Sequence, residues 1–279
     1  MAAITADRIA VSTWSLHRLL GSTYPHDLTR FEVGPEHQTY GEGEESLLGL
    51  PSVLANHGYH RLEIVSFHLR SLDPVYLGEL RDQLKVANVR LQTLLIDAGD
   101  LTHPEHGARD ERWIARWIEI ANELGAEHAR VVAGMQAPSP EALDRSAAAL
   151  RRLADGNAGS PVRLVTENWH SLLSGPEQVH ALLDRVEGRV GLLADFGNWK
   201  GPDKYQELAS IFARAELCHA KANFIDGDLD EADYGACVTA AEGAGYRGPY
   251  TLIFDSEVPA EWAGLRTERE FLLRDRADS

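Results

Sequence analysis

Short apolar runs alternate with amphipathic stretches along the whole chain. Runs of this length predict buried strands, and stretches with an apolar residue every three or four positions predict helices. We predict strands over residues 8–14, 60–65, 90–96, 129–133, 162–166, 190–194, 216–219 and 250–254. We predict helices over residues 45–57, 74–87, 109–124, 139–154, 176–186, 202–213, 231–244 and 260–273.

This regular alternation favours a parallel sheet, and eight strand–helix units are the number that closes a (β/α)8 barrel. No change in composition marks a linker, so we predict one domain over residues 1–279. A doubly wound sheet is the alternative fold. It is disfavoured because no glycine-rich phosphate-binding fingerprint follows the first strand.

The connection over residues 21–43 lengthens the first strand–helix unit by roughly twenty residues compared with the others. Connections that follow barrel strands lie on the rim where active sites form, so we predict an extended first loop there. Its histidines, His26 and His37, are candidates for contacts from a lid. Solvated loop histidines are the simpler interpretation.

The overall composition is that of a soluble globular protein, with 44% hydrophobic and 25% charged residues. The net charge of −16 repels phosphate backbones, which disfavours nucleic acid as a partner. No apolar run is long enough to span a membrane, and the first residues do not resemble a signal peptide. With only two cysteines, we expect a cytoplasmic, reducing location.

Three consecutive predicted strands end in side chains that can bind a metal. Glu167 ends the fifth strand, Asp195 follows the sixth, and His219 ends the seventh. Because strand ends meet at one mouth of a barrel, we expect the three to lie close together. Two carboxylates and an imidazole suit Mn²⁺, Mg²⁺, Co²⁺ or Zn²⁺. The alternative is three unrelated residues, for example Asp195 as the cap of a helix.

Three segments give the chain a resemblance to the xylose isomerase-like TIM barrels, namely Glu167–His170, Asp195–Asn198 and His219–Lys221. Residues 124–126 and 245–250 extend the resemblance over nearly the whole chain. The superfamily includes sugar isomerases and epimerases, inosose dehydratase and endonuclease IV. The resemblance is specific for the superfamily and not for a substrate.

The resemblance implies one divalent metal ion, with Mn²⁺ the expected ion and Mg²⁺, Co²⁺ or Zn²⁺ as alternatives. Glu167, Asp195 and His219 would fill three of the four ligand positions of the family. The fourth, a glutamate on strand eight, aligns with Ile253. Asp255 lies two residues further on the same face of the strand, and we predict it as the replacement ligand.

Other polar and aromatic residues near strand ends suit a polyol. We predict Glu167 as a base as well as a ligand, Lys221 as a cation that stabilises an enolate, and His170 as an acid–base group. Glu63 has two interpretations, a substrate contact or a hydrogen-bond acceptor inside the barrel. The predicted substrate-binding set is Trp14, His17, Glu63, His68, Asn168, Trp169, Asn198, Trp199 and Asn223.

The leading hypothesis is a metal-dependent isomerase, epimerase or dehydratase-type lyase that acts on a sugar, inositol or related polyhydroxy carbonyl compound through an enediolate. The missing strand-eight glutamate favours a one-base isomerase or a lyase over a two-base epimerase. A second hypothesis is a barrel that has lost catalysis and serves as a sugar-binding or partner subunit. Endonuclease IV-type DNA repair is disfavoured by the charge of −16. Relatives often form dimers or tetramers, so a homo-oligomer is an expectation.

Overall fold

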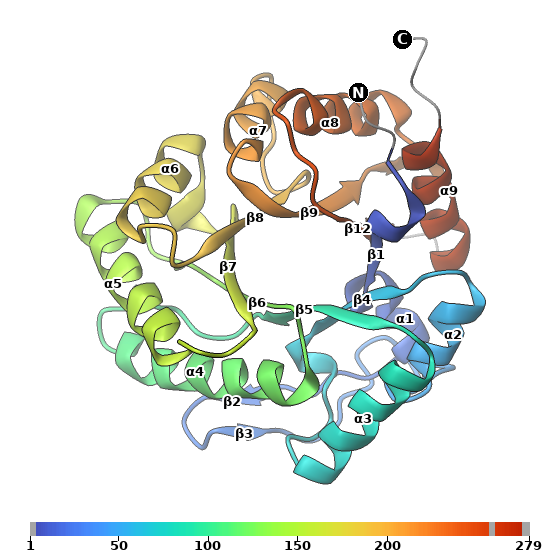
Figure 1. Ribbon diagram of the computed structural model, residues 1–279, viewed down its shortest axis with the longest axis horizontal. Helices are drawn as coiled ribbons and strands as arrows, with labels where there is room; N and C mark the ends of the chain where they lie inside the picture. The colour runs from blue at the N-terminus through green and yellow to red at the C-terminus, as the bar shows by residue number, and fades with distance from the viewer. Residues whose placement is uncertain (1–3, 257–259, 275–279) are drawn as a thin grey trace.

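The computed structural model describes residues 4–256 and 260–274, and in them eight parallel strands close into a barrel (Figure 1). Each strand pairs with its neighbours in chain order, and the first strand pairs with the last. The predicted (β/α)8 barrel is therefore confirmed. Its strands are β1 (Ile9–Ser12), β4 (Arg61–Val65), β5 (Arg90–Ile96), β6 (His128–Val131), β7 (Arg163–Glu167), β8 (Gly191–Asp195), β9 (Ala215–Ala222) and β12 (Tyr250–Phe254).

Helices surround the barrel on its outer face (Figure 1). They are α1 (His17–Leu20), α2 (Leu50–Asn56), α3 (Pro74–Val86), α4 (Gly107–Leu124), α5 (Pro140–Gly156), α6 (Pro176–Arg185), α7 (Lys204–Phe212), α8 (Glu231–Gly243) and α9 (Glu261–Leu273). Single 3-10 turns are η1 (Ala6–Arg8), η2 (Thr13–Leu16), η3 (Ser66–His68) and η4 (Ser171–Leu173). A further two-stranded sheet joins β10 (Phe224–Ile225) and β11 (Asp228–Leu229).

All eight predicted helices are present, and the largest error in a boundary is at the start of α2. We predicted its first residue as Glu45, whereas the helix begins at Leu50. Pro51 lies in its first turn, where backbone N–H groups have no acceptor within the helix, so proline costs no helical hydrogen bond. The preceding residues form turns instead.

The extended first loop carries a small hairpin between α1 and α2. Its strands are β2 (His26–Asp27) and β3 (Glu32–Val33), which lie beside α4 on the outside of the barrel (Figure 1). The ring of His26 packs against Trp113 and Trp117 of α4, with centroids 5.1 and 4.7 Å apart. Burial lowers the pKa of His26 to about 4. The simpler interpretation of His26 as a solvated loop residue was therefore wrong.

Inside the barrel, an apolar layer lies directly beneath the mouth. Val65, Leu95, Val165, Leu193 and Leu217 form one buried cluster, each contributed by a different strand. Because side chains alternate along a strand, the residue two positions further on points into the barrel from the same face. Three of those residues are the candidate ligands at positions 167, 195 and 219. The apolar layer thus forms the floor beneath them.

Candidate metal centre

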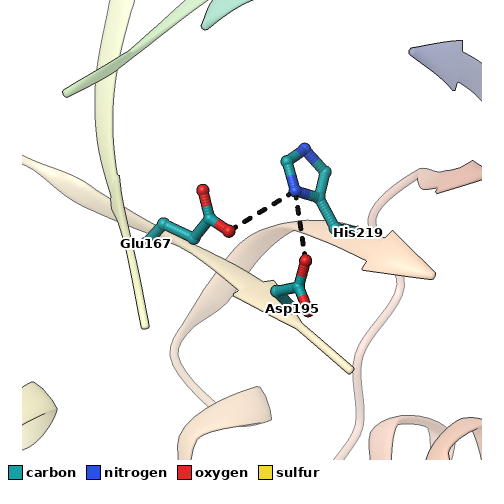
Figure 2. A group of neighbouring side chains, drawn as sticks. All are labelled: Glu167, Asp195 and His219. Carbon is teal, nitrogen blue, oxygen red and sulfur yellow. Dashed lines mark ion pairs between the residues drawn. The ribbon is translucent and has the colours of Figure 1, made fainter. Parts of the chain in front are cut away.

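Glu167, Asp195 and His219 converge in the barrel mouth, as the sequence predicted. Each offers one ligand atom, and these atoms lie within 4.8 Å of one another. His219 Nδ1 is 3.6 Å from Glu167 Oε1 and 3.5 Å from Asp195 Oδ2 (Figure 2). Both separations exceed an ordinary hydrogen bond, so two carboxylates and one ring nitrogen face a shared space.

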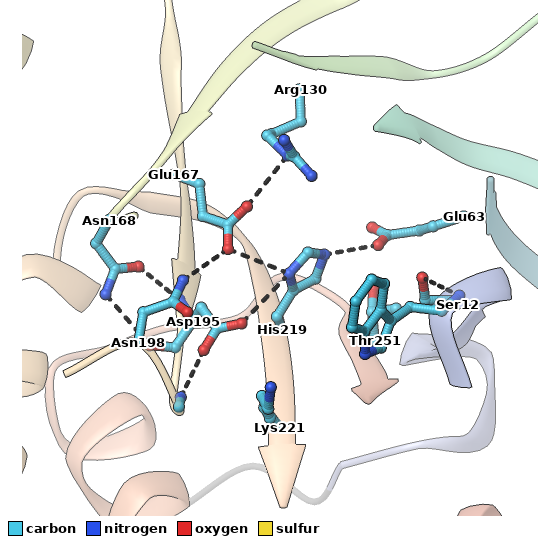
Figure 3. Close-up of polar contacts among 12 residues, drawn as sticks. Ser12, Glu63, Arg130, Glu167, Asn168, Asp195, Asn198, His219, Lys221 and Thr251 are labelled. Atoms are coloured by element: carbon cyan, nitrogen blue, oxygen red, sulfur yellow. Dashed lines mark hydrogen bonds and ion pairs between the residues drawn. The ribbon is translucent and has the colours of Figure 1, made fainter. Parts of the chain in front are cut away.

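The opposite side of the His219 ring is held by Glu63 from β4. Glu63 Oε2 lies 2.8 Å from His219 Nε2 (Figure 3). Glu63 Oε1 accepts hydrogen bonds from Gln92 and Thr93 at 2.9 Å. Glu63 is completely buried, so of its two interpretations the acceptor inside the barrel is correct. A carboxylate on the far nitrogen of a histidine is the usual outer partner of a metal-bound imidazole.

Arg130 of β6 fixes Glu167, and sequence reasoning missed it. Its Nε lies 3.1 Å from Glu167 Oε2, while Asn198 Nδ2 donates to Glu167 Oε1 at 2.8 Å (Figure 3). Burial would raise the pKa of Glu167, but Arg130 and His219 outweigh it and lower that pKa to about 2. Glu167 is therefore an ionised carboxylate, with Oε1 in a hydrogen bond and Oε2 in an ion pair.

Asp195 is fixed through its backbone and its side chain. Asn168 accepts from the backbone N–H of Asp195 at 2.7 Å and donates to its carbonyl at 3.2 Å. The backbone N–H of Gly197 donates to Asp195 Oδ1. A side chain at Gly197 would place its Cβ 2.7 Å from the Lys221 side chain. Glycine therefore allows the segment after β8 to lie close to Lys221 of β9. Asn168 is fully buried and positions a ligand, where we had predicted a substrate contact.

Asp255 does not lie with the other three candidate ligands. Its carboxylate pairs with Lys221 Nζ at 2.6 Å, and the two side chains are 39% and 29% exposed. Ile253, at the position where the resemblance implies a glutamate ligand, lines the mouth. The structure thus groups three of the four predicted ligands and leaves Asp255 paired with the predicted catalytic cation.

A cavity of about 110 Å³ opens above the three ligands. Trp14, Trp169 and Asn198 line it, as do Lys221 and Arg130. The guanidinium of Arg130 lies over the Trp169 ring, 5.1 Å from its centroid. Indole faces beside hydroxyl-binding polar groups are suited to a small polyol. Of the predicted substrate-binding residues, Trp14, Trp169 and Asn198 line this space.

The remaining predicted contacts lie outside the cavity lining. Trp199 is buried and donates through Nε1 to the carbonyl of Leu173, and Asn223 donates to Asp233 at 2.8 Å. Neither side chain lines the cavity, so the prediction that both bind substrate gains no support from the structure.

Three predicted histidines also lie apart from the cavity lining. His17 Nδ1 is 2.5 Å from the carbonyl of Trp14, and His68 Nδ1 is 2.9 Å from Thr13 Oγ1. Burial lowers the pKa of both, that of His68 to about 3. His170 stacks on Trp169 with ring centroids 4.0 Å apart. It contacts the indole ring without lining the cavity, so its predicted role as an acid–base group stays a prediction.

The residues present fit a divalent cation. Carboxylate oxygens with an imidazole nitrogen form a hard-to-borderline donor set, and all three ligands are buried. Burial would lower the pKa of His219, but Glu63 and Glu167 outweigh it and raise that pKa well above 6.5. So much negative charge around one imidazole is the environment that a bound cation neutralises.

The fold and the site together define a TIM barrel with a candidate metal centre at the carboxyl ends of its strands. The description "xylose isomerase-like TIM barrel" matches residues 51–274, and the chain belongs to that family. No curated protein sequence matches the chain significantly. Among residues 4–256 and 260–274, no helix combines the length and apolar character that crossing a membrane requires.

Solved structures share the fold at low sequence identity. An L-ribulose 3-epimerase is 16% identical with a TM-score of 0.68, over 95% of this chain and 92% of the other. D-allulose 3-epimerase from Methylomonas sp. is 17% identical with a TM-score of 0.67, over 98% and 99%. A xylose isomerase-like TIM barrel protein from Mycobacterium smegmatis, in complex with magnesium, is 16% identical with a TM-score of 0.68, over 98% and 97%.

Proposed function

We propose that this protein is a divalent-metal-dependent isomerase or epimerase that acts on a sugar or a related polyhydroxy carbonyl compound. The observation that carries the proposal is the buried group of Glu167, Asp195 and His219 beneath a small polar cavity. Similar structures include an L-ribulose 3-epimerase and a D-allulose 3-epimerase, which supports a keto-sugar as substrate. A dehydratase-type lyase shares the same first proton abstraction and is the alternative reaction.

Glu167, Asp195 and His219 would hold the cation, and the protein supplies their orientation through Arg130 and Glu63. A bound divalent ion would polarise a carbonyl oxygen and acidify the neighbouring C–H bond. Mn²⁺ is the ion that we propose. Mg²⁺ is the alternative with support from a structural relative, the Mycobacterium smegmatis protein in complex with magnesium.

The chain's own groups would bind the rest of the substrate. Trp14 and Trp169 offer apolar faces to the sugar carbons, and Asn198 offers polar contacts. Lys221 would place a positive charge near the oxygen on which negative charge develops. The second role that the sequence suggested for Glu167, as a base, stays a prediction. Asn198 contacts one of its oxygens and Arg130 the other, which favours its role as a ligand.

A binding-only barrel is the second candidate, and one observation favours it. Ile253 occupies the place of a ligand, and Asp255 pairs with Lys221 in place of joining the metal group. Copurification of a divalent metal separates the two candidates when followed by a turnover assay. A cytoplasmic location, homo-oligomerisation and the lack of nucleic-acid binding stay predictions.

The test is a metal-loaded activity screen against ketoses, inososes and other keto-sugars, with products identified by NMR. We expect turnover with Mn²⁺ and its loss in Glu167→Gln, which removes a ligand charge but keeps the side-chain shape. Glu177→Gln is the matched control, because Glu177 is an exposed residue on α6. Metal binding without turnover of any compound would support the binding-only barrel. Full activity of the Glu167 variant would contradict the assignment of the site.

A further inference from the structure

Asp97 lies on the inward face that carries the three candidate ligands. It follows Leu95 by two positions, as Glu167, Asp195 and His219 follow the other floor residues on their strands. Asp97 also lines the same cavity as those three. A fourth carboxylate therefore faces the substrate space, from β5 rather than from strand eight of the barrel.

One oxygen of Asp97 is fixed and the other is free. Asp97 Oδ1 pairs with Arg130 Nη2 at 2.5 Å, and Arg130 Nη1 donates to the carbonyl of Ile96. Within residues 4–256 and 260–274, no group donates a hydrogen bond to Asp97 Oδ2. The Asp97 side chain is 20% exposed, compared with 5% for Glu167. The same guanidinium thus holds two carboxylates and leaves Asp97 the more open to the cavity.

The carboxylates of Glu167 and Asp195 belong to the candidate metal centre, and Asp97 lies outside that group of ligands. Glu167 contacts Arg130 and Asn198, and Asp195 accepts from the Gly197 N–H. Burial raises the pKa of Asp97, and Arg130 offsets only part of that rise. Asp97 lines the same cavity with one oxygen that accepts no hydrogen bond from the described residues, which is the arrangement that a general base requires.

Asp97 stands across the mouth from Lys221. β5 and β9 are diametrically opposed strands, since four steps separate them in either direction around the closed barrel. Both residues line the 110 Å³ cavity, so a substrate that fills it lies between Asp97 and Lys221, whose ammonium is held by Asp255. A base on one side and a fixed positive charge on the other suit the removal of a proton next to a carbonyl group.

We propose that Asp97 is the catalytic base of this protein, with its free Oδ2 as the proton acceptor and Arg130 as the residue that positions it. The inference rests on the proposed isomerase or epimerase function and adds a named base to it. Strand eight lacks the family's glutamate at Ile253, and Asp97 supplies a carboxylate from another strand.

The proposed step moves one proton and one electron pair. The C–H bond next to the substrate carbonyl breaks, and its proton goes to Asp97 Oδ2. The electron pair of that bond forms the carbon–carbon double bond, while the carbonyl π pair becomes the charge on the oxygen. Return of the proton from Asp97 to the former carbonyl carbon completes an isomerisation with no net oxidation or reduction. In that step the neighbouring hydroxyl oxygen becomes the new carbonyl oxygen, and its proton moves to the oxygen that held the charge.

The experiment follows exchange of substrate protons in D₂O by NMR. L-ribulose, D-allulose and D-fructose are incubated with the Mn²⁺-loaded protein, its Asp97→Asn variant and the control Asp82→Asn, which changes an exposed residue of α3. Asparagine keeps an acceptor for Arg130 but has no basic oxygen. We expect wild-type exchange, unchanged exchange in the control, and a loss of about 100- to 10,000-fold in Asp97→Asn.

Mn²⁺ affinity and thermal midpoint are measured on the same samples, because a general loss of structure would lower both. Loss of exchange with unchanged metal affinity supports Asp97 as the base. Exchange within about threefold of wild type in Asp97→Asn overturns the inference and leaves the proposed function standing. A parallel loss of exchange and metal affinity makes Asp97 a structural partner of Arg130, which also overturns it. Absence of wild-type exchange with every ketose overturns the proposed function and the inference together.

Discussion

Replacement of Glu63 by glutamine tests the metal centre without replacing any of its three candidate ligands. Glu63 Oε2 lies 2.8 Å from His219 Nε2, and Gln92 and Thr93 donate to Glu63 Oε1. In Glu63→Gln the amide oxygen still accepts from Gln92 and Thr93, and the amide NH₂ faces His219 Nε2. His219 then carries its proton on Nδ1, the nitrogen that faces Glu167 and Asp195. A protonated nitrogen has no lone pair for a metal.

The expected loss in metal affinity is about 10- to 100-fold, the range found when the outer partner of a metal-bound histidine is removed. This corresponds to about 1.4 to 2.7 kcal/mol of binding free energy. Isothermal titration calorimetry with Mn²⁺ measures it directly, with Glu177→Gln as the matched control on the surface. A folded Glu63 variant that binds Mn²⁺ within about threefold of wild type would refute the role assigned to this carboxylate.

Two further predictions concern stability. The pKa of His26 is about 4 in the folded state and about 6.5 when unfolded. The free energy of unfolding that burial of the neutral ring contributes is therefore fully present above about pH 6.5 and is lost as the pH falls towards 4. His26 should account for about 2 kcal/mol of the stability lost between pH 7 and pH 5 in urea titrations, in addition to the loss from His68, whose pKa is about 3 in the folded state. His26→Phe should reduce the total loss by about 2 kcal/mol, and an unchanged loss would exclude His26 as a source. Gly264→Ala should cost about 1 to 3 kcal/mol, because its Cβ would collide with the Phe254 ring. Gly243→Ala, with open space at its Cβ, should change stability by less than about 1 kcal/mol, and equal effects would contradict the packing argument.

Much of the fold could be predicted from the sequence because each barrel strand is a short apolar run followed by an amphipathic helix. The three ligands could be predicted for a related reason, since each comes at the end of such a run. The hairpin of residues 26–33 escaped notice because its strands are two residues long and carry no periodic signal.

The partners of the ligands were harder to predict than the ligands. Arg130 lies within the apolar run of β6. Both faces of a barrel strand are buried, one against helices and one against side chains inside the barrel, so the sequence pattern does not show which way Arg130 points. For Glu63, the choice between a substrate contact and a hydrogen-bond acceptor inside the barrel depended on contacts with β5 and β9. Such contacts join residues far apart in the chain, and a single sequence does not record them.

The hydrogen bond between Glu63 and His219 joins two residues 156 positions apart. β4 and β9 are not neighbours in the sheet, since β1 and β12 lie between them on the shorter arc, so this bond crosses the inside of the closed barrel. A half-barrel fragment that contains β7, β8 and β9 would hold all three ligands without the brace on the imidazole. High-affinity Mn²⁺ binding should therefore appear late in folding. A signal that reports Mn²⁺ binding would then report when the barrel closes.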